Sequence, residues 1–142
     1  MIFQEQGIDR VFCDTSFFYA CLDNQDVHHG RARTLVEDAA TAHVVFYSTW
    51  DIVSGTVTLL RYHWSYTRAL AFLDHGKPLL RLVPYDDSVR LQAEDVCSRL
   101  GRDKKLSWCD TISFVVMTML LNHMACLSFD QDFTQLGLTV IS

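Results

Sequence analysis

The sequence has little of what separates domains or anchors a chain in a membrane. Its 142 residues include only two prolines and six glycines, and no repeat, low-complexity tract or Pro/Gly/Ser-rich linker occurs. No apolar run reaches the roughly 18 residues that a membrane span needs. The amino-terminal residues lack the basic start and apolar core of a signal peptide. These absences predict one domain over residues 1–142 that stays in the cytoplasm and makes no membrane contact.

Paired cysteines and an excess of basic residues are also missing. The five cysteines are odd in number and form no CxxC pair, and most have apolar neighbours, so we interpret them as reduced core residues. Lysine and arginine number 12 against 17 aspartates and glutamates, a net charge of −5. This balance argues against binding of nucleic acid through the overall field. It leaves a nuclease open, because carboxylates that bind divalent cations are counted here without their metal.

What the sequence does contain is a regular alternation of β-prone and helical segments. Helical periodicity and cap residues predict helices over residues 15–22, 28–40, 52–60, 65–73, 86–100 and 106–123. Strands are predicted over residues 10–13, 43–47, 79–83, 124–129 and 138–141. Ser48 and Asp51 have the spacing of a capping box at the start of the third of these helices. Such alternation predicts an α/β fold, with a parallel sheet covered by helices on both faces.

Acidic residues follow the predicted strands at the edge where such sheets bind ligands. Asp14 and Asp130 come directly after strands, and Asp110 lies in the first turns of the helix that starts near Ser107. We expect these carboxylates, with Asp132 close by, to meet in one pocket. Carboxylates so close imply a cation or raised pKa values, and oxygen ligands favour Mg²⁺ or Mn²⁺ over zinc. Taken singly, each acid could instead be a helix cap, a partner of a helix N-terminus or a turn residue.

Three segments resemble the acidic motifs of PIN-domain nucleases, and the branch of VapC-like toxins is the nearest. They surround Asp14 (VFCDTS), Asp110 (LSWCDTISF), and Asp130 with Asp132 (LSFDQDFTQLG), in the order of the family. The resemblance implies a three-layer α/β/α sandwich with a central parallel sheet, and metal-dependent cleavage of RNA. It implies that Asp14, Asp110 and Asp130 are metal ligands and that Asp132 is an accessory ligand or an outer acid. Homodimers and a cognate antitoxin are common in this family.

The sequence departs from the family pattern at Gly55. The family usually has a glutamate in the helix after the second strand, ahead of a Leu-Leu-Arg sequence, and here residues 56–61 fit that context. A glycine offers no ligand, and in a helix interior it costs about 1 kcal/mol relative to alanine. Asp51 lies one helical turn earlier on the same face. It either reaches the pocket through a water or completes the capping box with Ser48.

Other residues near the acids have two interpretations each. Thr15 and Ser107 are either hydroxyl supports of the acids or helix caps. Lys104 and Lys105, just before the Asp110 helix, and Arg61 are candidates for contact with RNA phosphates, the alternative for the lysines being a solvated loop. The aromatic-rich stretch of residues 62–73 is a candidate for dimer or antitoxin contact.

The leading functional hypothesis is a toxin-like, metal-dependent endoribonuclease that hydrolyses RNA phosphodiesters, with activity reduced by Gly55. The alternative is a catalytically impaired PIN domain that acts as an RNA- or protein-binding module. A phosphatase or phosphoacceptor domain ranks below both, because Ser16 stands where those proteins usually have a second acid.

Overall fold

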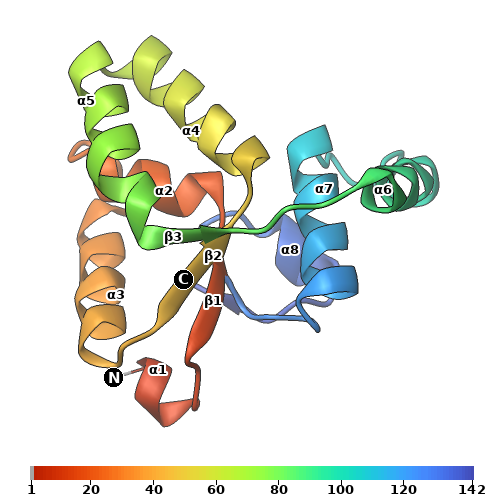
Figure 1. Cartoon of the computed structure of the whole chain (residues 1–142), viewed down its shortest axis with the longest axis horizontal. Coiled ribbons are helices and arrows are strands. Elements are labelled where there is room, and N and C mark those ends of the chain that lie inside the picture. Colours follow the sequence, from red (N-terminus) through yellow and green to blue (C-terminus); the bar gives the residue numbers. More distant parts are fainter. Residues whose placement is uncertain (1) are drawn as a thin grey trace.

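A five-stranded parallel sheet forms the centre of the computed structural model, which describes residues 2–142 (Figure 1). The strand order is β3-β2-β1-β4-β5, and every neighbouring pair is parallel. The central strand β1 is buried from Val11 to Cys13 and pairs with β2 on one side and β4 on the other. The strands are β1 (Arg10–Cys13), β2 (Val45–Ser48), β3 (Leu80–Leu82), β4 (Cys126–Leu127) and β5 (Val140–Ile141).

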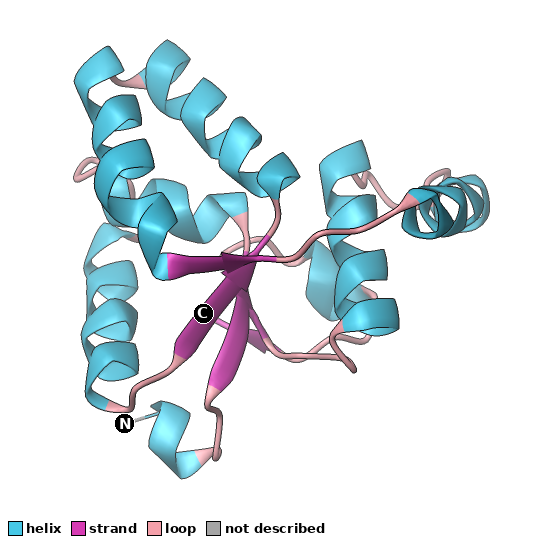
Figure 2. Ribbon diagram, in the orientation of Figure 1, coloured by secondary structure: helices cyan, strands magenta, loops and turns pink. Residues whose placement is uncertain are grey.

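Helices cover the sheet from both sides. Figures 1 and 2 show α2 and α3 on one side of the strands and α7 and α8 on the other, with α6 outermost beside α7. The helices are α1 (Ile2–Glu5), α2 (Thr15–Leu22), α3 (His29–Thr41), α4 (Trp50–His63), α5 (Tyr66–Ala71), α6 (Asp87–Leu100), α7 (Trp108–Val115) and α8 (Asp132–Gln135). The predicted α/β class, with a parallel sheet between two helical layers, is confirmed.

Two segments differ from their prediction for identifiable reasons. The helix predicted to reach residue 123 ends in a π-helical turn at Val116–Leu120. Asn122 and His123 follow with φ of 52° and 60°, a left-handed conformation that no α-helix continues through. The strand predicted over residues 124–129 is confined to Cys126–Leu127, because the backbone N–H groups beyond Ser128 bond to serine side chains. The short helices α1 and α8 were not predicted.

The core lies on both faces of the sheet and includes two of the five cysteines. Phe12, Phe17 and Phe133 are fully buried there. Cys13 and Cys126 are buried as expected, and all five thiols are free. Cys97 is exposed on α6, so the expectation that it belongs to the core is wrong; its neighbour Val96 faces inward while its own position faces outward. No helix within residues 2–142 is long and apolar enough to cross a membrane.

Candidate metal centre

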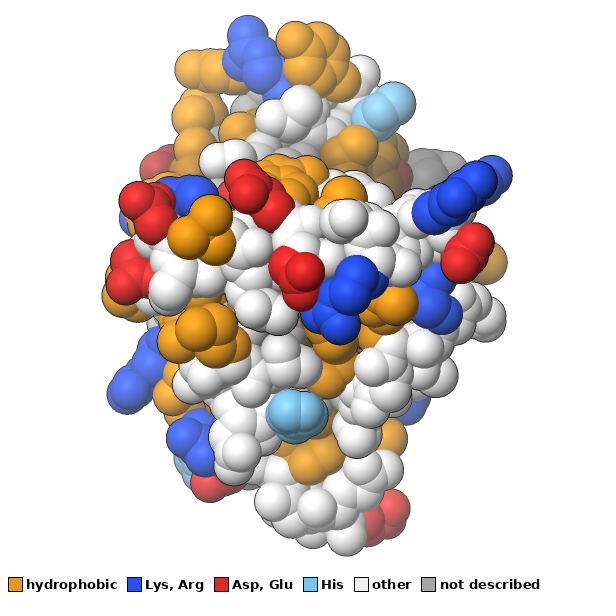
Figure 3. All heavy atoms as spheres, turned by 90° about the vertical axis from the view of Figure 1, so that its right-hand side faces the viewer, with side chains coloured by type: hydrophobic (Ala, Val, Ile, Leu, Met, Phe, Trp, Pro, Cys, Tyr) orange, Lys and Arg blue, Asp and Glu red, His pale blue; other side chains and the backbone are white. Residues whose placement is uncertain are grey.

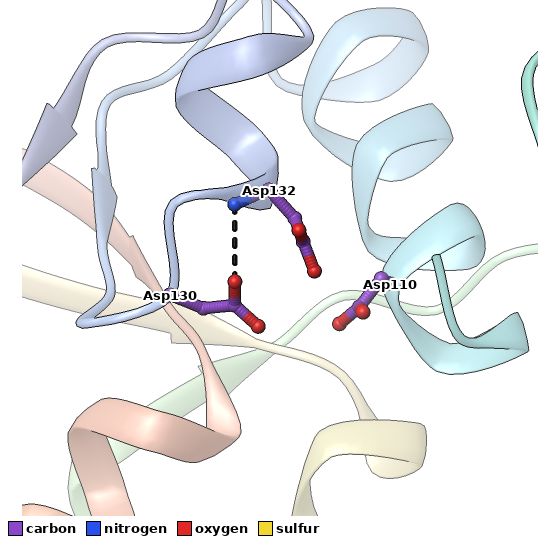
Figure 4. Close-up of side chains that lie close together, drawn as sticks. All are labelled: Asp110, Asp130 and Asp132. Atoms are coloured by element: carbon purple, nitrogen blue, oxygen red, sulfur yellow. Dashed lines mark hydrogen bonds between the residues drawn. The ribbon is translucent and has the colours of Figure 1, made fainter. Parts of the chain in front are cut away.

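Four aspartates gather at the carboxyl ends of β1 and β4. Asp14 follows β1, Asp130 follows β4, Asp110 lies in the first turn of α7, and Asp132 begins α8. Carboxylate oxygens of Asp110, Asp130 and Asp132 lie within 4.8 Å of one another, and Figure 4 shows the three side chains pointing toward a common point. Asp14 lies outside this 4.8 Å group but lines the same cavity of about 790 Å³ as Asp110 and Asp130.

Asp14 is the most deeply placed of the four acids. It is 3% exposed, and its Oδ2 accepts hydrogen bonds from the hydroxyls of Ser128 (2.9 Å) and Ser16 (3.1 Å). Burial raises the pKa of the Asp14 carboxyl, the serine hydrogen bonds lower it, and the charge of Asp130 raises it further. The carboxylate is therefore oriented by two hydroxyls while its charge lacks a cationic partner among the described residues.

Ser16 and Ser128 are site residues whose role as supports of Asp14 was not predicted. Besides bonding Asp14, the Ser16 hydroxyl accepts the N–H of Phe129 and the Ser128 hydroxyl accepts the N–H of Asp130, each at 3.0 Å. The two serines thus bind the segment after β1 to the segment after β4. A serine directly after a buried apolar strand, where core packing favours an apolar residue, was the available signal for Ser128.

Asp110 is held in place by the start of its own helix. The Ser107 hydroxyl accepts the N–H of Asp110 at 3.0 Å, and Asp110 Oδ2 accepts the N–H of Ser107 at 3.2 Å, which together form a capping box. Ser107 is therefore a helix cap and, through that cap, a support of the acid. Burial raises the pKa of the Asp110 carboxyl, and the charge of Asp14 adds to the rise.

Asp130 and Asp132 form a local turn. The N–H of Asp132 donates to Asp130 Oδ1 at 3.0 Å. Burial and then the charge of Asp130 raise the pKa of the Asp132 carboxyl, whereas the charge of Lys104 lowers it. Neither Lys104 nor Lys105 lines the cavity, and Lys105 is exposed in the same loop. The structure does not bring Arg61 to the cavity lining; its guanidinium lies 4.9 Å from the ring centroid of Tyr66.

The surface around α6 and α7 carries charges of both signs. Figure 3 shows acidic and basic side chains interspersed over this face, without a continuous field of either sign. This mixture agrees with the net charge of −5. Attraction for a polyanion therefore has to come from local contacts at the cavity rather than from the whole surface.

Helix α4 forms a wall of the cavity, and there the expected capping box is wrong. Strand β2 extends to Ser48, whose hydroxyl donates to the Cys13 carbonyl at 3.0 Å, so the cap moves to Thr49, whose Oγ1 accepts the N–H of Ile52. Asp51 takes no part in this cap. It lines the cavity and accepts a hydrogen bond of 2.5 Å from the Tyr85 hydroxyl.

Gly55 also lines the cavity, one turn after Asp51. A Cβ atom at this position would find one neighbouring heavy atom within 4 Å, Thr15 Oγ1 at 3.6 Å, an ordinary van der Waals distance. The first helical residue of α2 therefore stands next to the position where the family pattern has a glutamate. Space for a Cβ atom is present at this wall, and no carboxylate side chain extends from it.

The donor atoms around the cavity fit a hard divalent cation. The Cys109 thiol also lines the cavity, but burial, followed by the charges of Asp110 and Asp14, raises its pKa to about 12. One thiol among carboxylates is not the cysteine- and histidine-rich donor set that zinc sites use. The available anionic donors are then carboxylate oxygens, which Mg²⁺ and Mn²⁺ prefer.

Comparison with known proteins identifies the family. The model of the PIN domain matches residues 11–138. The crystal structure of VapC20 from Mycobacterium tuberculosis, a sarcin-ricin loop cleaving toxin, has a TM-score of 0.79 and 25% identity, and the match covers 91% of this chain and 96% of that chain. FitAcB from Neisseria gonorrhoeae matches at a TM-score of 0.67 with 14% identity over 93% of this chain and 96% of that one, a likeness of fold alone. No curated protein sequence matches significantly. The chain, with its acidic motifs in the expected order and its parallel sheet between helices, belongs to the PIN-domain family.

Proposed function

We propose that this chain is a metal-dependent endoribonuclease that hydrolyses RNA phosphodiesters. The observation that carries the proposal is the approach of the Asp110, Asp130 and Asp132 oxygens to within 4.8 Å of one another, beside the buried Asp14. Such a group of carboxylates is stabilised when a cation neutralises it. Membership of the PIN-domain family and the likeness to the toxin VapC20 support RNA as the substrate class.

The residues of the chain divide the work in this proposal. Asp14, Asp110 and Asp130 hold one or two Mg²⁺ or Mn²⁺ ions, with Asp132 as an accessory ligand. When bound, such an ion supplies Lewis acidity that lowers the pKa of water and stabilises charge on a phosphodiester. Ser16 and Ser128 orient Asp14, and Ser107 orients Asp110, so the carboxylates are set before substrate binds.

Basic residues give the proposed site its hold on the RNA backbone. Lys104, whose charge acts on Asp132, is one such candidate, and Lys105 follows it in the same loop. Contacts of this kind position a nucleic acid without reading its sequence. Arg61, exposed at the far part of α4, is proposed as a contact for a more distant phosphate of the same strand.

The substitution Asp14→Asn tests the proposed nuclease. It keeps the size of the side chain and removes the buried negative charge, so we expect cleavage of single-stranded RNA in Mn²⁺ to fall at least about a hundredfold. Cleavage is measured on a labelled RNA with Mn²⁺, with Mg²⁺ and with EDTA. The matched control is Asp74→Asn, an exposed aspartate outside the cavity. Equal cleavage by Asp14→Asn and the unsubstituted chain, or cleavage that persists in EDTA, would contradict the proposal.

A second candidate function is favoured by Gly55. Because no carboxylate occupies this part of the cavity wall, the chain could be a PIN domain that binds RNA or protein without efficient hydrolysis. A titration with Mn²⁺ followed by calorimetry separates the two functions. The nuclease binds the ion at millimolar concentration or below, whereas a pure binding module shows no heat of binding and no cleavage at high protein concentration.

The proposal extends to protein partners. The likeness to the toxin VapC20 supports a cognate antitoxin that restrains the activity, and a homodimer is proposed because homodimers are common in the family that the acidic motifs resemble. Tyr62 and Tyr66, at the junction of α4 and α5, are 81% and 59% exposed, which suits residues that become covered in a complex. Light scattering of the purified chain measures whether it forms the homodimer.

A further inference from the structure

A second hollow adjoins the acidic cavity. Its volume is about 540 Å³, and it shares with the acidic cavity four lining residues: His28, Phe129, Asp130 and Gln131. The remainder of its lining is mostly polar and includes Arg31 and Gln135. A linear polymer bound at the carboxylates can therefore continue over His28 and Phe129 into this second hollow.

Stacked aromatic rings form the boundary between the two hollows. The His28 imidazole lies parallel to the Phe129 ring, with centroids 4.4 Å apart and an interplanar angle of 1°. Beneath Phe129 lies the fully buried Phe17, at a centroid distance of 6.3 Å. His28 is exposed, so the series of rings that begins in the core ends in an imidazole with one face toward solvent.

Backbone hydrogen bonds fix the position of the stacked rings of His28 and Phe129 relative to the acids. Phe129 directly precedes Asp130, and its N–H donates to the Ser16 hydroxyl that also bonds Asp14. The N–H of His28 donates to Asp26 Oδ1 at 2.8 Å, which anchors the start of α3. His28 is the N-cap residue of α3, but its side chain forms no capping hydrogen bond with the helix.

Arg31 supplies a cation on the same side of α3. It lies three residues after His28, hence on the same helix face. Its Nε donates to the backbone oxygen of Ser142, the last residue, at 3.2 Å, and no Asp or Glu side chain in the described part of the chain forms an ion pair with it. An exposed guanidinium beside an exposed aromatic face suits a phosphate next to a stacked base.

We propose that the His28–Phe129 pair is a stacking platform for one unpaired nucleobase of a single-stranded RNA, with Arg31 on an adjoining phosphate. The proposal rests on the proposed function, since it places the base next to the phosphodiester at the acids. Stacking on an aromatic ring requires an unpaired base and tolerates any base identity. Gln131 and Gln135 carry amides that can both donate and accept hydrogen bonds at a base edge.

The experiment uses a short single-stranded RNA that carries the fluorescent base 2-aminopurine at successive positions. Binding is measured in Mn²⁺ with Asp14→Asn as the common background, which prevents cleavage. We expect quenching at one position, loss of that quenching in His28→Ala with about tenfold weaker binding, and retention of both in His28→Phe. His63→Ala, an exposed histidine at the end of α4, is the matched control.

The outcomes separate this inference from the proposed nuclease. Unchanged quenching and affinity in His28→Ala overturn the platform, even when the chain with Asp14 intact cleaves the RNA in Mn²⁺. Quenching that depends on His28 supports the platform even when no cleavage is found, and then it is the proposed nuclease that fails. Equal loss in His28→Ala and His28→Phe also overturns the platform, because a stacked ring is retained in the second variant.

Discussion

This chain departs from the pattern of its family at Gly55, and the structure shows where this residue lies relative to the acids. The glycine lines the acidic cavity on α4, beside Thr15, with room for a Cβ atom. Asp51, one turn earlier, lines the same cavity and is held by the Tyr85 hydroxyl rather than by the helix cap. Its charge, with those of Asp110 and Asp14, contributes to the raised pKa of the Cys109 thiol, so Asp51 lies near the other acids.

The substitution Gly55→Glu is expected to strengthen metal binding and RNA cleavage. A carboxylate at this wall adds an oxygen donor near the acids, and its Cβ fits without displacing Thr15. We expect about a tenfold gain in Mn²⁺ affinity by calorimetry and a gain of at least that size in the cleavage rate. Removal of a glycine from a helix interior also stabilises the fold by up to about 1 kcal/mol.

Gly55→Gln separates the new charge from the improved helix. The amide has nearly the same size and helix propensity as the glutamate, so both variants gain the helical stability and only Gly55→Glu gains metal affinity. Equal Mn²⁺ affinity in Gly55→Glu and the unsubstituted chain would contradict this prediction. It would mean that the centre needs no further carboxylate on α4, because Asp51 already supplies one.

At the scale of elements, helix α7 both bears an acid and depends on it. Asp110 and Ser107 exchange two hydrogen bonds at the first turn of α7. The substitution Ser107→Ala removes the cap, so we expect a loss of about 1 kcal/mol in the free energy of unfolding. Because the cap also orients Asp110, we expect Mn²⁺ affinity to fall by roughly tenfold, as measured by calorimetry.

Ser65→Ala is the matched control for this prediction. Ser65 caps α5 by accepting the N–H of Arg68 at 3.0 Å, and it is outside the lining of the acidic cavity. Both variants should lose similar stability in denaturant unfolding, whereas only Ser107→Ala should lose metal affinity. Similar Mn²⁺ binding in the two variants would mean that Asp110 keeps its orientation without the cap.

Periodicity in the sequence predicted the elements better than their ends. The strand before Asp14 and the helix that contains Asp110 were both predicted. Apolar runs and cap residues are patterns of neighbouring residues, so the sequence alone reveals them. Ser48 was assigned to the cap of α4, but pairing extends β2 to Ser48, and its hydroxyl bonds Cys13 instead. The bonds from Ser128 to Asp14 and from Phe129 to Ser16 join segments far apart in sequence, and periodicity does not predict them.

At the scale of the whole molecule, the acidic centre joins segments that the fold alone holds together. Its residues come from the ends of β1 and β4 and the starts of α7 and α8. Burial and mutual repulsion raise the pKa values of Asp14, Asp110 and Asp132, so in the metal-free protein these carboxylates oppose the fold that gathers them. A divalent cation that binds only the folded chain therefore stabilises all four segments at once.

We therefore expect Mn²⁺ to raise the melting temperature of the whole chain. At a hundred times its dissociation constant, a ligand that binds only the folded state contributes about 2.7 kcal/mol. For a chain of this size that corresponds to a rise of roughly 5–10 °C in differential scanning calorimetry. Asp110→Asn should abolish most of the rise, whereas Asp74→Asn, which changes the net charge equally but lies outside the centre, should keep it. An equal rise in both variants would mean that Mn²⁺ acts through the general negative charge of the chain and that the four aspartates form no metal centre.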